Sequence, residues 1–367
     1  MKNNYNFIDL FSGCGGFSAG LEMAGHNCLL GVDFNADAVK TFQRNHPKAA
    51  GLHMDIHKLN KRVLSKYIDI DSIDMVVGGP PCQGFSTVGK GEVEDERNSL
   101  FQQFVRIVKL TQPKVILFEN VTGMLAKKNE LIVKNIFKSF EKLGYVMDAQ
   151  VMSADDYGVA SRRRRAIIMG VKGGVPVYPK QSQRRKTITV EAVLSNLASR
   201  GVTHNHDISK AMLSNELDLK RLKHIPAGAG IRYERDEKKF LPKKLYFKID
   251  WNEISEGRFR QTRLQRLPLL EPAPTILTSR TMYYHPIDHR YLTPREAAAC
   301  QSFPNKFIFE GSITAQFRQI GNAVPPVLAK HIGKSIKEIK FSKSLKSNKP
   351  VDRSSIAENA FTYFKYA

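Results

Sequence analysis

The chain has 367 residues and a formal charge of +22, with 57 lysine and arginine residues against 35 aspartate and glutamate residues. So large a positive excess favours a polyanionic partner, first DNA or RNA, over a basic protein that binds no nucleic acid. The four cysteines form no Cys-x-x-Cys pair and no cluster with histidine, and no apolar run approaches the length of a membrane span. These features argue against structural zinc and a membrane protein, and they predict a cytosolic protein in a reducing compartment.

Residues 5–170 predict a parallel sheet wound with helices, because short apolar segments alternate with amphipathic ones. The predicted strands are 6–10, 28–33, 74–77, 115–119, 145–152 and 166–170, and the predicted helices are 36–45, 100–110 and 131–143. The length of the chain leaves room for a second, smaller domain.

A candidate cofactor site begins at residues 7–17, where the first strand runs into a glycine-rich turn and then a helix. Many tight turns look like this, but glycines there let a ligand approach the backbone at a helix N-terminus. The next strand ends at Asp33, which can bind ribose hydroxyls, and the following Phe34 can stack on adenine. Asp55 and Ile56 can add contacts to the base. Because the glycine spacing departs from Gly-x-Gly-x-x-Gly, an adenosyl methyl donor is favoured over a nicotinamide cofactor.

Cys82 lies in the segment Val-Val-Gly-Gly-Pro-Pro-Cys-Gln-Gly-Phe-Ser, just beyond the end of an apolar strand. The commoner fate of a free cysteine is a small buried hydrophobe. Here a polar, glycine-containing loop follows at 83–91, and the ends of strands in open α/β sheets are where chemistry is placed. The segment therefore indicates a nucleophile.

Glu119 closes the apolar run at 115–118 in the sequence Glu-Asn-Val. A lone glutamate is by default a cap or a surface charge. If the strands at 74–77 and 115–119 are neighbours, however, Glu119 lies beside Cys82, which favours a general-acid or hydrogen-bonding role.

Four consecutive arginines, 162–165, run directly into a predicted strand. Alternation along a strand would place Arg163 and Arg165 on one face and Arg162 and Arg164 on the other. One pair can then line a site while the other meets solvent or nucleic acid.

Residues 171–289 are basic and polar, with scattered proline and glycine and no steady period, which predicts a second irregular domain or a large insertion. Trp251, the only tryptophan, is favoured as a core residue over a base wedge. Helices are predicted around 294–302 and 327–340, followed by a lysine- and serine-rich tail. Candidate base readers in this region are Arg258, Arg260, Arg263 and Arg266, for which phosphate contacts are at least as well supported.

The ordered set of Phe-x-Gly-x-Gly-Gly, Pro-Pro-Cys-Gln, Glu-Asn-Val, an arginine-rich strand and Gly-Asn-Ala-Val-Pro-Pro resembles the DNA cytosine-5 methyltransferase family of the prokaryotic restriction-modification type. The resemblance implies an α/β, Rossmann-like, S-adenosylmethionine-dependent fold with a mostly parallel sheet. It also implies a smaller, irregular target-recognition domain. The expected boundaries are 1–171 with 313–340 for the catalytic domain, 172–312 for target recognition and 341–367 for a basic tail.

The resemblance also implies a mechanism. Cys82 would attack carbon 6 of a cytosine flipped out of the duplex, and carbon 5 would take the methyl group of S-adenosyl-L-methionine. Glu119 would contact ring nitrogen 3, with Arg163 and Arg165 near the base and Glu119. No metal is implied. The cofactor-side positions would be Phe11, Gly13, Gly16, Asp33, Phe34, Asp55, Ile56, Pro80, Leu100, Asn322 and Val324.

The sequence departs from the family pattern at three positions. Ser161 stands where glutamine is usual, Ala160 where proline is common, and Asp33 where glutamate is more frequent. Since none of these is the nucleophile, an active enzyme is expected.

The expected partner is double-stranded DNA, with a restriction endonuclease for the same site as a further candidate, no membrane, and a monomeric protein at the bacterial nucleoid. A tRNA-modifying relative of the same fold is disfavoured, because its Cys-Phe-Thr motif needs a cysteine between Cys82 and Cys300 and none occurs there. An inactive DNA-binding regulator would lack Cys82 or Glu119. A nicotinamide oxidoreductase is the weakest alternative.

Overall fold

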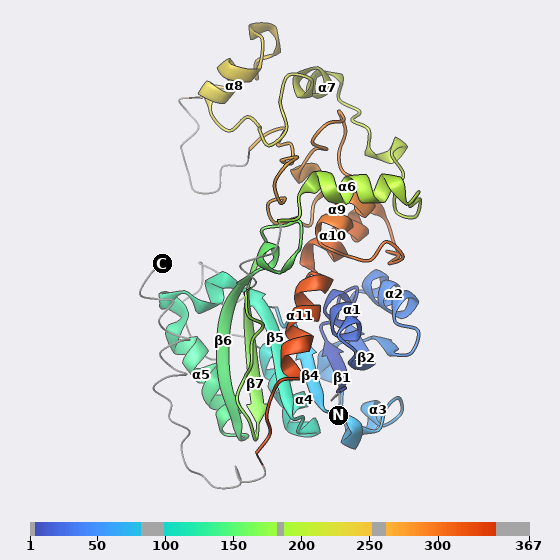
Figure 1. The fold of residues 1–367 in the computed structure, drawn as a ribbon, viewed down its shortest axis with the longest axis vertical. Helices are drawn as coiled ribbons and strands as arrows, with labels where there is room; N and C mark the ends of the chain where they lie inside the picture. Colours follow the sequence, from blue (N-terminus) through green and yellow to red (C-terminus); the bar gives the residue numbers. More distant parts are fainter. Residues whose placement is uncertain (1–3, 82–98, 182–186, 252–261, 343–367) are drawn as a thin grey trace. The chain divides into compact units, whose positions relative to one another are not determined.

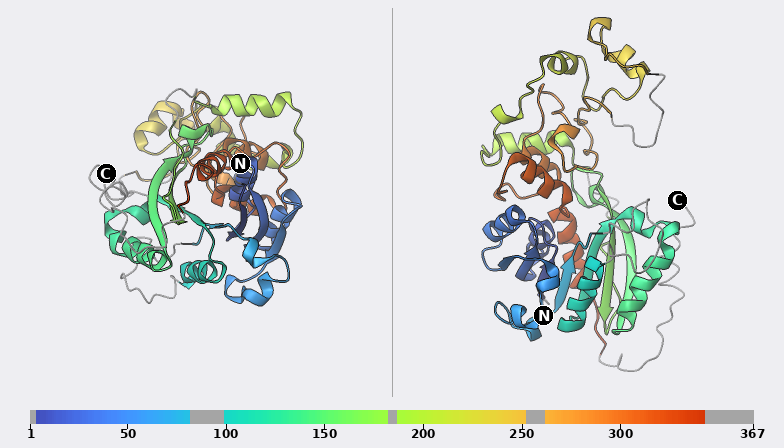
Figure 2. Two further views of the ribbon diagram at one scale, coloured as in Figure 1. Left: turned by 60° about the horizontal axis from the view of Figure 1, so that its bottom comes forward. Right: turned by 180° about the vertical axis from the view of Figure 1, so that it is seen from behind.

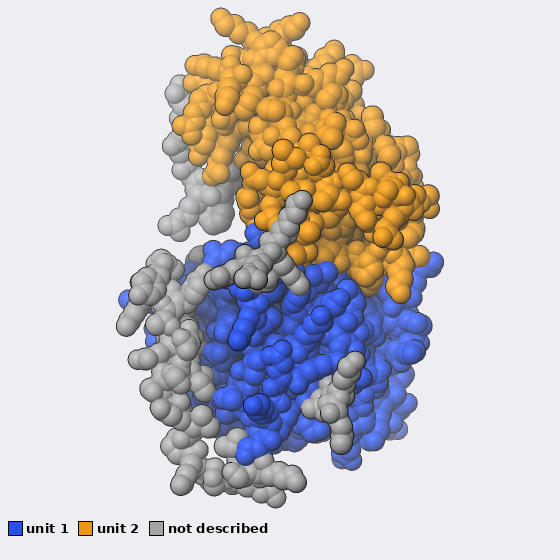
Figure 3. Space-filling view, viewed as in Figure 1, with its two compact units in different colours: residues 1–157, 164–184, 323–367 blue, residues 158–163, 185–322 orange. Residues whose placement is uncertain are grey.

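The computed structural model describes residues 4–81, 99–181, 187–251 and 262–342. The chain divides into two compact units, coloured separately in Figure 3. Unit 1 comprises residues 1–157, 164–184 and 323–367, and unit 2 comprises 158–163 and 185–322.

Unit 1 is built on a seven-stranded sheet in the order β3-β2-β1-β4-β5-β7-β6 (Figure 1). All strands run parallel except β7, which pairs antiparallel with both β5 and β6. The predicted α/β fold with a mostly parallel sheet is confirmed. The strands are β1 (Asn6–Leu10), β2 (Asn27–Asp33), β3 (Ala50–His53), β4 (Met75–Gly78), β5 (Val115–Val121), β6 (Tyr145–Ser153) and β7 (Arg164–Lys172).

Strand β3 was not predicted from the sequence. It is a four-residue edge strand, Ala-Gly-Leu-His, in which only Leu52 is buried, so it shows neither an apolar run nor a clear alternation. Its pairing with β2, rather than its own residue types, makes it a strand.

Helices cover both faces of the sheet (Figures 1 and 2). Ile8 and Leu10 of β1 point to one face, where they share a core with Phe104 and Phe140 from two helices. The opposite face of β1 carries Asp9, whose carboxylate accepts a hydrogen bond from the first helix. The α-helices in the described part of unit 1 are α1 (Gly16–Met23), α2 (Ala36–Asn45), α3 (Lys61–Leu64), α4 (Ser99–Thr111), α5 (Glu130–Glu141) and α11 (Pro326–Ile336).

Helix α11 joins unit 1 through close packing on α1. A Cβ atom on Gly20 of α1 would overlap the backbone of Pro326 and the side chain of Ala329. The absence of a side chain at Gly20 therefore lets the two helices approach. His26 adds a second tie, since its Nε2 lies 2.8 Å from the carbonyl oxygen of Gly333.

Unit 2 contains short helices and, in its described part, isolated bridges in place of a sheet. Its apolar core includes Leu222, Ile231, Leu264 and Tyr284. The irregular second region expected from the sequence therefore has five α-helices among its described residues: α6 (Val190–Ser199), α7 (Glu216–Leu222), α8 (Glu234–Phe240), α9 (Pro294–Cys300) and α10 (Ile313–Asn322).

Within residues 1–340 the boundaries of the two units differ from the expected domains at three places, the first of which is residues 158–163, expected in the catalytic domain but assigned to unit 2. Residues 172–184 belong to unit 1, where the Tyr178 hydroxyl donates to the carbonyl of Asp148 at 2.9 Å. Residues 313–322 belong to unit 2, where Gln301 donates to the carbonyl of Ile320 at 2.8 Å. The expected tail lies almost wholly outside the described residues. None of the helices in the described ranges has the length and apolarity needed to cross a bilayer.

Candidate active site

The carboxyl ends of β1, β2, β4 and β5 meet at one edge of the sheet, because these strands are parallel. The antiparallel β7 begins at the same edge, where Arg165 pairs with Val121 of β5. Most of the predicted site residues of unit 1 follow these strand ends. This is the edge at which open α/β sheets bind ligands.

The turn after β1 has an unusual backbone. Phe11 has φ 61°, Gly13 has φ 53° and Gly15 has φ 87°, all in the left-handed region. A Cβ on Gly15 would overlap the ring of His46, whereas one on Gly13 would meet nothing within 4 Å. Gly15 is therefore required for packing, and Gly13 leaves open space beside the backbone. Gly16 is the first residue of α1.

Asp33 ties this turn to the end of β2. Its Oδ2 accepts the backbone N–H of Gly13 at 2.8 Å and its Oδ1 accepts that of Asn35 at 2.8 Å. Burial raises the pKa of Asp33, and the backbone donors oppose that shift. The next side chain, Phe34, is 74% exposed. A fixed carboxylate thus lies one residue from an aromatic ring open to a ligand.

The next two predicted cofactor residues, Asp55 and Ile56, lie in different environments. The exposed Asp55 carboxylate accepts the backbone N–H of His57 at 3.0 Å, which lowers the pKa of Asp55. Ile56 instead lies in the apolar core, and its carbonyl accepts from Arg106 at 2.9 Å. The side chain of Ile56 therefore belongs to the core, and Leu100 also packs against that core.

Three of these residues have the chemistry needed to bind an adenosyl group. Asp33 offers carboxylate oxygens to ribose hydroxyls, Phe34 offers a ring face to adenine, and Gly13 leaves space for close approach to the backbone.

Cys82 lies outside the described residues, so its position beside Glu119 stays a prediction. The condition for that prediction is met, because β4 and β5 are neighbours and Gly78 pairs with Phe118. One residue further on, a Cβ on Gly79 would lie 3.8 Å from Oε2 of Glu119. The chain leading to Cys82 therefore passes alongside the Glu119 carboxylate.

Asn120 is a positioning residue to which the sequence analysis gave no role. Its side chain is buried, and its Nδ2 donates to the carbonyl of Pro80 at 3.2 Å. Its Oδ1 accepts the backbone N–H of Val121 at 2.8 Å. Asn120 thus fixes the backbone of the Pro-Pro pair to the end of β5, and its place in Glu-Asn-Val was the available signal.

Glu119 forms an ion pair with Arg165, with Oε1 and Nε 2.7 Å apart. The side chains are only 12% and 16% exposed, respectively. Because such a pair is shielded from solvent, it constrains the carboxylate more strongly than a surface pair would. Of the two arginines expected near Glu119, Arg165 is therefore in contact with it.

Arg163 has a different environment, within unit 2. It is 2% exposed, and its guanidinium donates to the carbonyls of Gly321 at 2.7 Å and Asn322 at 3.1 Å. Strand β7 begins only at Arg164, so the alternation expected across the four arginines does not extend to Arg163. Its observed bonds hold the end of α10.

The neighbouring Ser161 is buried, and its hydroxyl donates to the carbonyl of Pro274 at 3.0 Å. The departure from glutamine is thus accommodated by a backbone contact inside unit 2. The last two predicted cofactor positions fall in different units. Asn322 ends α10 in unit 2, and Val324 is buried in unit 1.

One candidate base reader of unit 2 is corrected by the structure. Arg266 is 2% exposed and donates to several backbone carbonyls, including those of Leu222 at 2.9 Å and Asp288 at 2.7 Å. It is therefore a structural residue rather than a DNA contact. Arg263 is exposed, and Arg258 and Arg260 lie outside the described residues. Trp251 packs against the core of unit 2, as favoured.

A second residue without a predicted role is Asp9, buried beneath the turn after β1. Its Oδ2 accepts the Ser18 hydroxyl at 2.6 Å. Desolvation by burial raises the pKa of Asp9 to about 7. A charge at this position is costly, so its protonation state affects the stability of the turn.

Comparisons with known proteins agree with this geometry. A family model described as C-5 cytosine-specific DNA methylase matches residues 5–338. Type II methyltransferase M.DdeI of Desulfomicrobium norvegicum is 32% identical, covering 90% of this chain and 88% of its own length. Type II methyltransferase M1.HphI of Haemophilus parahaemolyticus is 35% identical, covering 90% of this chain and 86% of its own length.

Solved structures share the fold. A DNA modification methyltransferase encoded within an E. coli prophage matches with a TM-score of 0.70 and 25% identity, over 91% of this chain and 99% of the other. The DNMT2 of Spodoptera frugiperda matches with a TM-score of 0.59 and 17% identity, over 91% of this chain and 99% of the other. At that identity the second match concerns the fold alone.

Proposed function

Because the chain belongs to the C-5 cytosine-specific DNA methylase family, we propose that Cys82 is the nucleophile with which it methylates carbon 5 of cytosine in double-stranded DNA. The observation that carries this assignment is the Glu119–Arg165 pair beside the backbone leading to Cys82. It supplies an oriented carboxylate next to the segment that bears the thiol.

The reaction begins with attack of the Cys82 thiolate on carbon 6 of a cytosine, which must leave the base stack because carbon 6 is inaccessible within the duplex. Glu119 contacts ring nitrogen 3 and stabilises the electron density that the new sulfur–carbon bond pushes into the ring. Arg165 holds Glu119 in place. Carbon 5 then takes the methyl group and loses its proton, and breakage of the sulfur–carbon bond restores the aromatic ring and the thiolate.

S-adenosyl-L-methionine, the proposed donor, supplies an electrophilic methyl group when bound. Asp33 and Phe34 would hold its adenosine, beside the open backbone at Gly13. Asp55, which is exposed, would add a polar contact. The methyl group would thereby be presented at the strand edge that carries Glu119.

A trapped adduct tests the role of Cys82. DNA in which 5-fluorocytosine replaces the target cytosine cannot lose a proton from carbon 5, so we expect the wild-type protein and methyl donor to give a covalent protein–DNA product that survives denaturing electrophoresis. Cys82→Ala should give none while still binding the duplex. An adduct of equal yield from Cys82→Ala would contradict the assignment.

Two substitutions, Glu119→Gln and its control Arg162→Gln, test whether a loss of methyl transfer is specific to Glu119. Glu119→Gln should lower the rate of methyl transfer about 100-fold or more, in line with the loss of a positioned acid–base group. Arg162→Gln removes an exposed arginine from the same run and should leave the rate unchanged. Equal effects of the two substitutions would contradict the role given to Glu119.

The biological role is proposed from the relatives, which are Type II methyltransferases of restriction-modification systems. The protein would act as a monomer in the bacterial cytoplasm, at the nucleoid, and protect a site from a cognate endonuclease. DNA methylated by the purified protein should then resist an endonuclease activity in extracts of the source cells. Unmodified DNA should be cut there, and equal cutting of both DNAs would contradict the role. Duplex DNA should also be methylated in preference to tRNA.

A further inference from the structure

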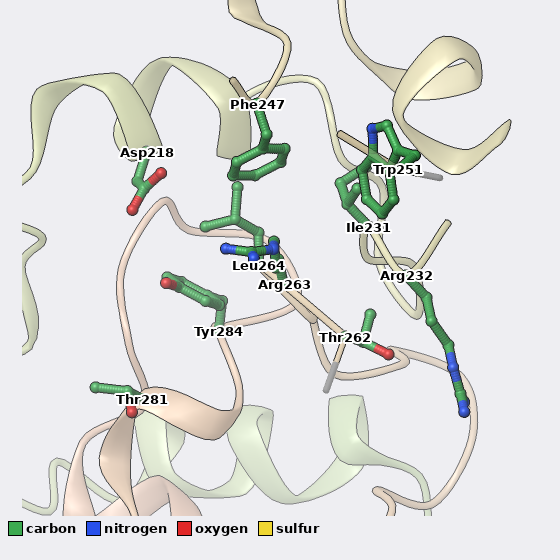
Figure 4. Close-up of a pocket in the computed structure, with 10 residues that line it drawn as sticks. All are labelled: Asp218, Ile231, Arg232, Phe247, Trp251, Thr262, Arg263, Leu264, Thr281 and Tyr284. Atoms are coloured by element: carbon green, nitrogen blue, oxygen red, sulfur yellow. The ribbon is translucent and has the colours of Figure 1, made fainter. Parts of the chain in front are cut away.

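Unit 2 contains a cavity of 410 Å³, a volume within the range of ligand pockets, about 300–1,000 Å³ (Figure 4). Three aromatic residues, Phe247, Trp251 and Tyr284, line it together with two arginines, Arg232 and Arg263. Rings and guanidinium groups are the side chains that recur where proteins contact nucleobases. None of the residues given a catalytic or cofactor role lines this cavity.

A buried carboxylate fixes the aromatic wall. Glu237 is 2% exposed, and it accepts hydrogen bonds from the backbone N–H of Phe247 and from the indole N–H of Trp251, the latter at 2.8 Å. Arg221 packs against the Phe247 ring, 3.9 Å from its centroid. The wall is therefore preorganised, which lowers the entropy lost when a ligand is held against it.

Arg263 is held in a defined orientation at this wall. Its backbone exchanges two hydrogen bonds with Ile231, both 2.8 Å long. The next residue, Leu264, has φ 50°, a left-handed conformation that is costly for a bulky side chain and persists where the surrounding structure fixes the backbone. The guanidinium group lies 5.4 Å from the centroid of the Phe247 ring, and Figure 4 shows the two side chains close together.

The charges around the cavity leave its arginines able to bind a ligand. The carboxylate that lines it, Asp218, pairs with Arg221 at 3.1 Å. Within the described ranges, no carboxylate lies at ion-pair distance from Arg232 or Arg263. An acceptor-rich group entering the cavity would therefore meet guanidinium donors that no carboxylate of the described residues neutralises.

We propose that Arg263, which lines this cavity, reads a guanine of the DNA target by donating to the guanine O6 and N7 atoms. This inference rests on the proposed function, since it assigns part of the sequence choice to unit 2. Arginine paired with these two atoms is the commonest specific contact in the major groove. A guanidinium oriented by a ring is suited to that planar, bidentate contact. The competing assignment, a phosphate contact, would give affinity without sequence choice.

The test uses duplexes carrying the sequence that the protein methylates, in which each guanine in turn is replaced by 7-deazaguanine, which lacks the N7 acceptor. We expect the wild-type protein to bind one of these duplexes about 10-fold more weakly than the unmodified duplex. Arg263→Met should bind the unmodified duplex equally weakly and lose nothing further on the deaza duplex. Arg235→Met removes another exposed arginine of unit 2, one that packs on Tyr233 outside the cavity, and it should keep the wild-type discrimination.

Trp251 provides the check on folding, because the single tryptophan of the chain lines this cavity. Emission from Arg263→Met without DNA should match that of the wild type. If Arg263→Met instead weakens binding to all duplexes alike and no deazaguanine has an effect, the contact is to phosphate and the inference is overturned. Methylation by the same preparations separates the two proposals. Site-specific methylation that persists without a guanine contact contradicts this inference alone, whereas no methylation of any DNA contradicts the proposed function.

Discussion

The two units satisfy their backbone groups in different ways. In unit 1 the carbonyls and N–H groups of seven strands pair along the ladder of one sheet. In unit 2 the long side chains of buried arginines supply many of the hydrogen-bond donors for backbone carbonyls in the interior. All the arginines that are buried in the described ranges belong to unit 2: Arg163, Arg221, Arg266, Arg290 and Arg295.

The difference follows from the chemistry of irregular backbone. A chain segment that forms no β-ladder leaves buried carbonyls without backbone hydrogen-bond donors. A guanidinium group offers five N–H donors in a fixed planar arrangement. Arg295 illustrates this, since it donates to the carbonyls of Pro304 and Phe307. Part of the positive charge of the chain is therefore structural, and it cannot all be counted as contact with a polyanion.

The largest expected effect comes from Arg266→Met. The substitution would remove the guanidinium hydrogen bonds to the carbonyls of Leu222, His285 and Asp288. At about 1.5–3 kcal/mol for each hydrogen bond from a charged donor, unit 2 should lose roughly 4 kcal/mol of unfolding free energy. Urea unfolding followed by Trp251 fluorescence measures this, since the only tryptophan lies in unit 2.

The matched variant in unit 1 is Arg106→Met. Arg106 is partly buried and donates to one backbone carbonyl, that of Ile56. Its loss should cost about 1 kcal/mol, measured by urea unfolding followed by circular dichroism. Equal costs for Arg106→Met and Arg266→Met would remove the contrast between the two units.

A smaller effect on stability is expected from a buried carboxyl group in unit 1. Burial raises the pKa of Asp9 from 3.8 to about 7, so the folded state binds the proton more tightly than the unfolded state. The resulting stability is fully present below about pH 4 and is lost as the pH rises through about 7. Asp9→Asn keeps an acceptor for Ser18 without the charge.

The variant should therefore be more stable than the wild type at pH 8, by roughly 3 kcal/mol, with the difference shrinking towards pH 4. Urea midpoints across that range measure the difference. A constant difference at all pH values would mean that Asp9 does not titrate in this range.

The smallest expected effect is at the surface of unit 2. Arg162 pairs with Glu271 at 2.6 Å, but both side chains are more than half exposed. Arg162→Gln should change the unfolding free energy by about 0.5 kcal/mol or less, and 1 M salt should remove the difference. A loss comparable to that of Arg266→Met would show that exposed arginines also hold this unit together.

The same contrast explains what could be predicted from the sequence. The strands and helices of unit 1 carry their apolar period locally, so residues 6–10 and 36–45 were predicted with the observed limits. In unit 2 an arginine looks the same in the sequence whether it binds DNA or backbone. Arg263 and Arg266 are three residues apart, one exposed and the other buried, and only the fold separates them.

In the site, the strand-end residues Asp33 and Glu119 could be predicted because parallel strands bring their carboxyl ends to one edge. The contact between Glu119 and Arg165 followed from the family pattern rather than from spacing. Asn120 and Asp9 were missed because their roles depend on how elements pack together: Asn120 bonds to Pro80 of the chain after β4, and Asp9 bonds to Ser18 on the buried face of α1.

The most direct test of the central claim is base-resolution sequencing of 5-methylcytosine in duplex DNA incubated with the purified protein and S-adenosyl-L-methionine. We expect methyl groups on carbon 5 of one cytosine within one recurrent sequence, and none with Cys82→Ala. Methylation by Cys82→Ala at the wild-type level, or methyl groups on adenine or on cytosine N4 instead, would contradict the account.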